Sequence, residues 1–314
     1  MWRPAYHVRL RVWPLPLFVV IHPDSIMPNS TEAPESPPAV MAFNAADPSG
    51  AAGLAADQAV CAAVGCHALP VTTSIWVRDT AEIFDIVEVE AEAVVEQARA
   101  VLEDVELAAW KVGFLGSVEV VSAVAELLAD YSQVPLVTYI GNLQALDEAQ
   151  AEEYIKAMQE LVLPQTRVLC GNLTALTQFL FPDMERDEPP TPEALMQQAQ
   201  GMGVQYLLVS GILVPENHVE NVLLSPRRQL LRERFEMFDA GFSGAGDTLS
   251  AAVAALLATG AKLDQAVHEA LEFLDQSLDF AYRPGMGQLV PDRFFWAQTG
   301  PEADDDSISP VSLQ

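Results

Sequence analysis

The sequence has little positive charge and little cysteine. It contains 16 Lys and Arg residues against 44 Asp and Glu residues among 314, a formal net charge of -28 at pH 7. Such a surface repels the phosphates of nucleic acids and of anionic lipids, so we expect neither nucleic acid nor a membrane as a partner. The 3 cysteines are too few and too irregularly spaced for a disulfide framework or a zinc site. We therefore expect a cytoplasmic protein with reduced thiols.

Long apolar runs and internal repeats are also missing. The apolar stretch 8–21 is too short to span a bilayer and is broken by arginine and proline. No small-residue cleavage site of a signal peptide follows it. We expect residues 1–38 to be a disordered extension and residues 299–314 to be an acidic disordered tail. The remaining domain, 39–298, has no heptads or repeats, which favours an enzyme over a solenoid or scaffold.

What the sequence does contain is a regular alternation of strand-like and helix-like segments. A buried strand over 40–45, a Pro-Ser-Gly turn and a helix over 53–64 form the opening unit. This alternation predicts one α/β domain with a mostly parallel sheet. The further predicted elements are strands over 69–77, 107–112, 136–140, 167–170 and 206–209, helices over 87–102, 117–131, 146–163 and 191–202, a hairpin of 219–224 with 229–237, and closing helices over 246–259 and 263–281.

The segment most informative about chemistry is the glycine-rich run before the first closing helix. The small residues Gly244, Ala245 and Gly246 let backbone amides converge, and the positive end of a helix stabilises charge on a transferring phosphoryl group. Asp247 follows at a position where its carboxylate can take a proton from an attacking hydroxyl. No G-K-[ST] follows, so this is not a P-loop. The alternative is an ordinary capped helix with an acid in its first turn.

Two segments resemble known kinases. Gly244-Ala-Gly-Asp247-Thr-Leu-Ser-Ala-Ala252 resembles the anion-hole and catalytic-base signature of ribokinase-like kinases. Asp47-Pro-Ser-Gly-Ala-Ala-Gly-Leu-Ala-Ala-Asp57 is similar to the more specific N-terminal motif of hydroxymethylpyrimidine and phosphomethylpyrimidine kinases, and the resemblance extends over roughly 40–296. It implies a three-layer α/β/α sandwich, a homodimer, ATP with Mg²⁺, and phosphorylation of a pyrimidine intermediate of thiamine biosynthesis.

The resemblance also implies roles for particular residues. Asp247 would be the base, with the amides of Gly244, Ala245 and Gly246 as the anion hole; no residue is assigned as a metal ligand. From the residues alone, the alternatives are a solvated helix carboxylate for Asp57, a turn-forming acceptor for Asp47 and a structural residue for Lys111. The remaining implied contacts are Ala45, Asp47, Asp57, Arg78 and Phe114 with the substrate, and Lys111, Asn172, Ser210 and Gly211 with the cofactor.

Several positions depart from the family pattern. Arg78 stands where these kinases present Gln, and a guanidinium only donates hydrogen bonds whereas an amide also accepts them. Arg78 is then either a ligand of a substrate phosphate or a partner of Asp79 or another surface acid. Ala175 replaces a Glu that helps to hold the magnesium hydration shell, and Thr138 stands where Asp is frequent. Ser210 and Gly211 lack a preceding Lys near the nucleotide.

These departures leave two alternatives open beside the pyrimidine kinase. The first is a pyridoxal or pyridoxine kinase, since that branch shares the fold. The second is a degenerate paralogue that binds a pyrimidine or a nucleotide without catalysis. The intact Gly-Ala-Gly-Asp run favours an enzyme, because a binding protein has no chemical need for a base there.

Overall fold

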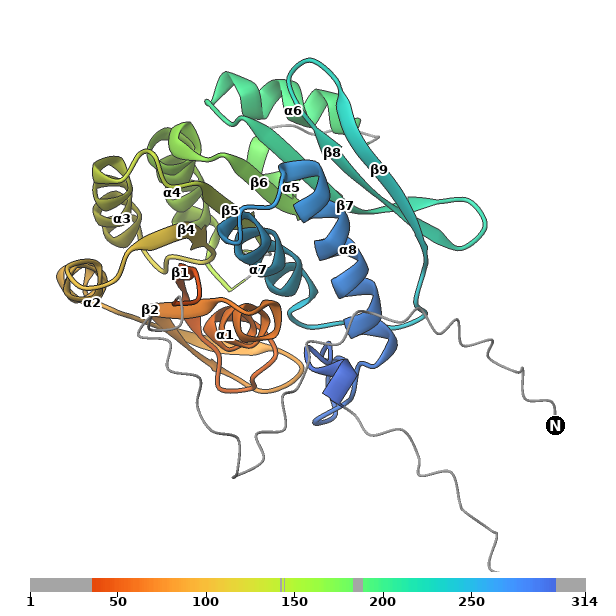
Figure 1. Ribbon diagram of the computed structural model, residues 1–314, viewed down its shortest axis with the longest axis horizontal. Helices are drawn as coiled ribbons and strands as arrows, with labels where there is room; N and C mark the ends of the chain where they lie inside the picture. The colour runs from red at the N-terminus through yellow and green to blue at the C-terminus, as the bar shows by residue number, and fades with distance from the viewer. Residues whose placement is uncertain (1–35, 142, 144, 183–188, 298–314) are drawn as a thin grey trace, which may run out of the picture. The chain divides into compact units, whose positions relative to one another are not determined.

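A nine-stranded sheet forms the centre of the described part of the chain (Figure 1). The structure is a computed structural model that describes residues 36–141, 143, 145–182 and 189–297, and the fold lies within the unit Pro37–Gln314. The strands follow the order β3-β2-β1-β4-β5-β6-β7-β8-β9. Their bounds are β1 Ala39–Ala46, β2 His67–Arg78, β3 Ile83–Glu88, β4 Leu107–Val112, β5 Leu136–Ile140, β6 Val168–Asn172, β7 Tyr206–Val214, β8 His218–Leu224 and β9 Gln229–Glu236.

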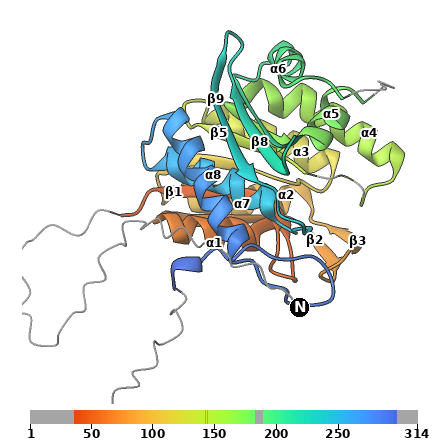
Figure 2. The same ribbon diagram turned by 90° about the vertical axis from the view of Figure 1, so that its right-hand side faces the viewer.

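Helices cover both faces of this sheet, which confirms the predicted three-layer α/β/α sandwich (Figures 1 and 2). One face packs against α1, α7 and α8, and the other against α2 to α6. Within the described ranges, no helix has both the length and the apolar character needed to cross a membrane. The helix bounds are α1 Gly53–Val64, α2 Ala91–Leu102, α3 Val118–Asp130, α4 Glu148–Ala157, α5 Leu173–Leu180, α6 Pro192–Gly201, α7 Ala245–Ala258 and α8 Leu263–Asp279.

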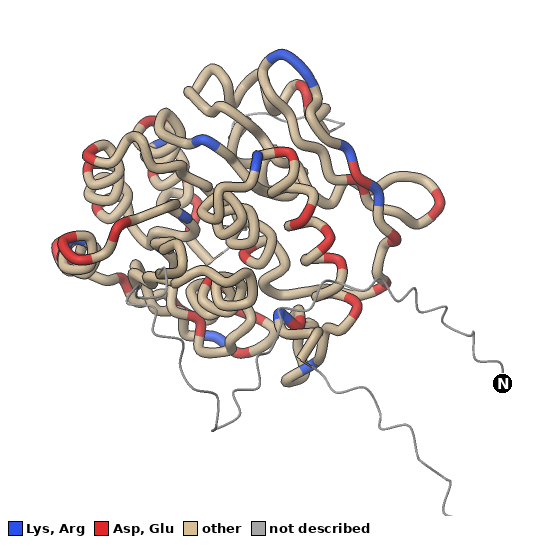
Figure 3. Tube along the Cα trace, in the orientation of Figure 1, with Lys and Arg blue, Asp and Glu red and all other residues tan. Residues whose placement is uncertain are grey.

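The interior of the sheet is parallel and its margins are antiparallel. Strands β2, β1, β4, β5, β6 and β7 pair in parallel, whereas β3 pairs antiparallel to β2 at one margin. At the other margin β7, β8 and β9 form antiparallel pairs, so the predicted hairpin is confirmed. Acidic residues outnumber basic ones along the trace (Figure 3).

The structure corrects the sequence prediction at three elements. Strand β3 was not predicted, because Ile83–Glu88 has mostly exposed side chains, Phe84 at 60%, and so lacks a buried alternating face. Helix α2 begins only after β3, and Glu90 at its N-cap position makes no side-chain capping hydrogen bond. Helix α5 was also missed: Leu173–Leu180 is short, and it depends on Asn172, whose side chain accepts the amide hydrogen of Ala175 at 2.8 Å.

The third correction concerns the predicted helix over 146–163. Helix α4 ends at Ala157 and continues as the π-helical turn Met158–Val162 and a 3-10 turn, Leu163–Gln165, in which Pro164 cannot donate a backbone hydrogen bond. The predictions of disorder for residues 1–38 and 299–314 fall almost entirely on residues outside the described ranges and stay predictions.

Parallel pairing brings the carboxyl ends of six strands to one edge of the sheet. Val112 of β4 pairs with Thr138 of β5, and Ile140 of β5 pairs with Gly171 of β6. Helix α1 follows β1 at the same edge and lies beside α7 (Figure 1). In open α/β sheets ligands bind at this edge, so the topology places the glycine-rich turn before α7 where a ligand is expected.

The largest fully buried side chain of the described residues, Trp110, lies in the core on the α2–α6 face. Trp110 of β4 is fully buried, stacked on Phe43 with ring centroids 5.8 Å apart and in edge contact with Tyr131 at 5.7 Å. Its indole nitrogen is buried without a hydrogen-bond partner. Trp110 therefore contributes by packing and area burial rather than through its polar atom.

Replacing Trp110 tests this account of the core. Trp110→Ala should lower the free energy of unfolding by about 3–5 kcal/mol, because it leaves a cavity between Phe43 and Tyr131. Trp110→Phe should cost much less, because the lost indole N–H makes no hydrogen bond. Urea denaturation measures both, with Phe84→Ala as the exposed control. Equal losses for Trp110→Ala and Phe84→Ala would contradict this account.

Candidate active site

Helix α7 begins at a turn that accepts only glycine. Gly244 caps the helix with φ of 84°, and a side chain there would overlap the carbonyl of Ala51 and approach the Arg293 guanidinium to 2.8 Å. The carbonyl of Gly244 accepts hydrogen bonds from the amide and hydroxyl of Thr248 at 2.9 and 2.8 Å. By their position the amides of Ala245, Gly246 and Asp247 have no acceptor within the helix. They are therefore available to an anion.

Asp247 belongs to a buried polar cluster with Asn44, Asp57 and Lys111. The Lys111 Nζ lies 2.9 Å from Oδ1 of Asp247 and 2.8 Å from Oδ1 of Asp57. The contact with Asp57 is an ion pair without directional hydrogen-bond geometry. Asn44 donates from Nδ2 to Oδ2 of Asp57 at 2.9 Å and to Oδ1 of Asp247 at 2.8 Å. Four elements, β1, α1, β4 and α7, thus contribute one group each.

Burial and mutual charge decide the protonation of this cluster. Burial raises the pKa of Asp57 to about 6; the charge of Lys111 opposes this rise and that of Asp247 adds to it. Burial alone would lower the pKa of Lys111, but Asp247 and Asp57 outweigh it and raise that pKa above its ordinary value. Lys111 is thus an ammonium at neutral pH although it is fully buried. A buried ammonium persists only because both carboxylates contact it.

A cavity of about 370 Å³ opens beside the start of α7. It brings together Gly244–Gly246 with three residues predicted to contact the cofactor, Asn172, Ser210 and Gly211. Asn172 also caps α5, the Ser210 hydroxyl donates to the Gly171 carbonyl at 3.3 Å, and Gly211 has φ of 69°. Lys111, predicted in the same group, lies instead in the buried cluster. The apolar part of the lining comes from Val219, Phe238, Phe242, Leu271, Leu274 and Leu278.

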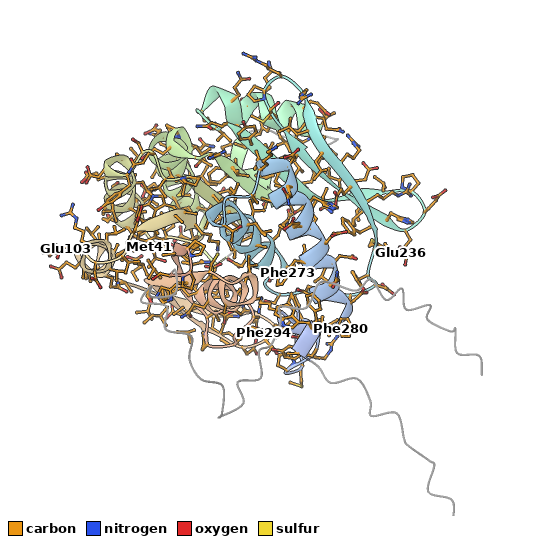
Figure 4. The ribbon with its side chains drawn as sticks, in the orientation of Figure 1. Met41, Glu103, Glu236, Phe273, Phe280 and Phe294 are labelled. Atoms are coloured by element: carbon orange, nitrogen blue, oxygen red, sulfur yellow. The ribbon has the colours of Figure 1, made fainter. Side chains whose placement is uncertain are left out.

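Acidic residues also line this cavity. Glu236 ends β9 on the side of α8, and Asp275 lies on α8 itself (Figure 4). Burial raises the pKa of Asp275 to about 6, and the neighbouring charges of Asp279 and Glu236 add to the rise. These carboxylates repel phosphate groups, so the phosphate end of a bound nucleotide is expected at the amides of α7.

Tyr139 is a cavity residue that the sequence did not suggest. It precedes the buried Ile140 at the end of β5, and its ring and hydroxyl lie so close to Gly246 that a side chain at 246 would overlap them. Burial raises the pKa of the Tyr139 hydroxyl, so this group stays a hydrogen-bond donor. The Nζ atom of Lys111 lies 5.6 Å from the centroid of the Tyr139 ring. A Tyr at the carboxyl end of a buried strand was the only available signal, and on its own it indicates core packing.

The residues predicted to contact the substrate lie around the turn after β1. Asp47 accepts hydrogen bonds from the amides of Ser49 and Ala52, both at 2.8 Å, so the turn-forming reading describes its local contacts. Ala45 is fully buried and donates its amide hydrogen to Asn44. Phe114 packs on Trp76 and Tyr154, with ring centroids 6.2 and 5.4 Å away. Contact of these residues with a substrate stays a prediction.

Arg78 connects this region to the glycine-rich turn. Its guanidinium lies 3.4 Å from Asp47 and donates to the hydroxyl of Ser243 at 3.3 Å, next to Gly244. It donates further to the backbone carbonyl of Asp79 at 2.9 Å. The side chain is 6% exposed, and it also lines a second cavity of about 390 Å³ together with Ser49 and Thr80. Arg78 therefore pairs with an acid, but this acid is the buried Asp47 and not Asp79 or a surface acid.

Arg293 is a second residue that sequence reasoning missed. It is 5% exposed and donates to the carbonyls of Gly50 and Ala51 and to the Thr248 hydroxyl, the last at 2.9 Å. It thereby ties the turn after β1 to the first turn of α7. Burial lowers the pKa of Arg293, with Asp247 and Asp57 opposing that effect. No local motif surrounds Arg293, and its partners lie more than 40 residues away, so the sequence could not indicate its role.

An α/β/α sandwich with a glycine turn before a helix, an acid in the first turn of that helix and a cavity at the carboxyl edge of the sheet has the architecture of the ribokinase-like fold. The model of the family described as phosphomethylpyrimidine kinase matches residues 47–292, and the chain belongs to that family. It is similar to the hydroxymethylpyrimidine/phosphomethylpyrimidine kinase of Streptomyces coelicolor, with 28% identity over 266 residues that cover 84% of this chain and 97% of that protein.

Solved structures share the fold. The pyridoxal kinase from Staphylococcus aureus in complex with ADP matches with a TM-score of 0.74 at 19% identity, over 84% of this chain and 96% of that one. The phosphomethylpyrimidine kinase from Clostridium difficile 630 matches with a TM-score of 0.64 at 19% identity, over 77% and 99%. At these identities the likeness establishes the architecture alone.

The contact between Gly246 and Tyr139 leads to a test of the cavity. Gly246→Ala should lower the free energy of unfolding by about 1–3 kcal/mol, because the new methyl group overlaps the Tyr139 ring. It should also weaken nucleotide binding, since the ring must move toward the cavity. Thermal unfolding with and without ATP measures both effects. Gly201→Ala, in α6 with open space around it, is the matched control and should be neutral or stabilising. Equal behaviour of the two variants would contradict the proposed contact.

Proposed function

We propose that this chain transfers the γ-phosphoryl group of ATP to the hydroxymethyl group of a 4-amino-2-methylpyrimidine, to the phosphate of its monophosphate, or to both, in thiamine biosynthesis. The observation that carries the proposal is the position of Asp247. Asp247 lies in the first turn of α7 and directly follows Gly246, the last of the three residues of this turn that line the cavity. Its side chain contacts Lys111 of the buried cluster. Family membership supports the choice of acceptor.

The residues support an in-line transfer. The acceptor oxygen attacks the γ-phosphorus, the bond from that phosphorus to the bridging oxygen of ADP breaks, and ADP leaves with the electron pair. Where the acceptor is a hydroxyl, its proton passes to the Asp247 carboxylate. The amides of Ala245 and Gly246, at the positive end of α7, stabilise the negative charge on the transferring oxygens.

ATP fits the cavity by the chemistry of its two ends. The apolar side chains from β8 and α8 suit the base, and the amides of α7 suit the phosphates. Among the described residues, no group of three or more His, Cys, Asp or Glu side chains could hold a metal ion. Magnesium therefore fits only as an ion carried largely by the phosphates and water, where it would neutralise charge on the β- and γ-oxygens. Ala175, in place of a carboxylate, agrees with that expectation.

The acceptor would lie near Asp247 on the side of Arg78, with Phe114 and Trp76 as its aromatic surroundings. Arg78 donates but cannot accept hydrogen bonds, so it favours an acceptor that carries negative charge over a neutral aminopyrimidine. We propose the monophosphate as the preferred acceptor for this reason. Pyridoxal stays the alternative acceptor, which the shared fold permits. A homodimer is part of the proposal and rests on the family resemblance alone.

The role of Asp247 is tested by a conservative substitution. Asp247→Asn should reduce phosphoryl transfer to a hydroxymethyl group by about 10²–10⁴-fold, because the amide cannot take the proton. Binding of ATP should persist, since the cavity lining is intact. Product masses and ADP release would be followed with magnesium-ATP and a panel of hydroxymethylpyrimidine, its monophosphate and pyridoxal. Asp264→Asn, in the first turn of α8, is the matched control. A wild-type chain that phosphorylates nothing in the panel would sink the proposed function.

The preference for a charged acceptor is tested at Arg78. Arg78→Gln should lower kcat/KM for the monophosphate by about 10-fold or more and leave that for hydroxymethylpyrimidine equal or higher, because a charge-assisted contact contributes about 1.5–3 kcal/mol. Steady-state kinetics with both acceptors give the ratio, with Arg99→Gln on α2 as the control. An unchanged ratio would show that Arg78 serves only the turn at Asp47.

A further inference from the structure

The phosphoryl-transfer step uses the Asp247 carboxylate but gives no task to the buried groups that hold it. We propose that Lys111 is a positioning residue for the catalytic base, and that Asp57 is its counter-charge rather than a ligand of the substrate. This inference rests on the proposed function, because it concerns the orientation of the base. It differs from the prediction that Lys111 contacts the cofactor.

The argument begins with the oxygens that are contacted. Lys111 and Asn44 both reach Oδ1 of Asp247, at 2.9 and 2.8 Å. Neither contact involves Oδ2, so the second oxygen turns away from both donors. A carboxylate fixed through one oxygen presents the other in a constant direction, which is what proton transfer from a bound hydroxyl requires. Side chains from β1 and β4, Asn44 and Lys111, thereby fix the orientation of the base.

The position of Asp57 supports its part in the proposal. Its Oδ1 lies at the Lys111 Nζ and its Oδ2 accepts from Asn44, so both oxygens face groups of the cluster. The residue is 1% exposed. A substrate contact would have to displace one of these partners. Without Asp57 the ammonium would face a single carboxylate, and without Lys111 two buried carboxylates would face each other.

The charge balance of the cluster makes the inference testable by pH. Lys111 from β4, Asp247 from α7, Cys61 from α1, Tyr139 from β5 and Arg293 after α8 all interact with Asp57 or lie within its field. The cation and the two carboxylates sum to one negative charge. Removing the cation leaves two negative charges in a buried site, a situation in which two carboxylates share a proton.

The test is the Lys111→Met variant, whose side chain keeps much of the length of lysine without its charge. We expect kcat to fall by about 10²-fold with the KM for ATP nearly unchanged, because the base is misplaced while the cavity is intact. The acid limb of the pH profile of kcat/KM should move to higher pH by at least about one unit, because the carboxylate pair retains a proton. Lys262→Met, at the exposed start of α8, is the matched control.

A second variant distinguishes positioning from a merely structural role. Lys111→Met with Asp57→Asn restores a single negative charge, and its acid limb should return toward that of the wild type. If Lys111→Met does not fold, Asp57→Asn alone decides: its acid limb should move to lower pH, because a like charge has been removed beside Asp247. Its KM for the acceptor should stay within about 3-fold, whereas a substrate ligand would raise it more than 10-fold. If the acid limb of the pH profile of kcat/KM is the same in these variants as in the wild type, the proposal is overturned.

A measurement without substrate separates this proposal from the proposed function. The thermal stability of Lys111→Met should fall as the pH rises from 5 to 8, since the shared proton must be lost in the folded state and the protonated pair is the stable one. The double variant should lack this dependence. Should the wild type phosphorylate no member of the acceptor panel while the variants follow this pattern, the ion cluster stands and the assigned reaction fails. A Lys111→Met variant with the pH dependence of the wild type refutes the cluster itself.

Discussion

The close approach of two backbone segments is the constraint on which the site depends. The carbonyl of Ala51, in the turn after β1, lies against Gly244 at the start of α7, and no side chain fits between them. Arg293 bridges the same two segments through the Ala51 carbonyl and the Thr248 hydroxyl. Because of this contact, the first helix and the seventh begin at the same edge of the sheet. The two acids they carry, Asp57 and Asp247, consequently meet one lysine.

The electrostatics of the protein are local rather than global. With a formal charge of -28 the molecule as a whole repels a nucleotide, and the acidic residues over its outside give no attraction at long range (Figure 3). We therefore propose that binding of phosphate comes from the oriented amides at the start of α7. The buried cluster serves a different purpose. Its single cation contacts two carboxylates of the chain, which balance its charge, and in the proposed mechanism it orients the base.

The sequence anticipated the elements whose patterns are strong and local. The alternation of buried strands and amphipathic helices predicts the parallel interior, and the two strand-like runs after it predict the hairpin. Strand β3 was not predicted because its side chains are mostly exposed, and α5 was not predicted because it is a short helix defined by its cap. Gly244 to Asp247 and the Asp47 turn were found by composition and spacing. Asn44, Tyr139 and Arg293 were not. None of the three lies in a recognisable sequence motif, and each reaches the site only through contacts with residues from distant elements.

The residues by themselves determined the class of fold and the acid in the first turn of a helix after a glycine-rich turn, because these follow from periodicity, turn chemistry and chain order. Tertiary structure alone decided which groups touch that acid. It placed Lys111 against Asp57 and Asp247 rather than in the nucleotide cavity, and Arg78 beside Asp47. The physical reason is that burying an unpaired charge costs free energy, so each buried charge lies next to an opposite charge. Here these opposite charges come from segments distant in the sequence, and no local sequence pattern indicates them.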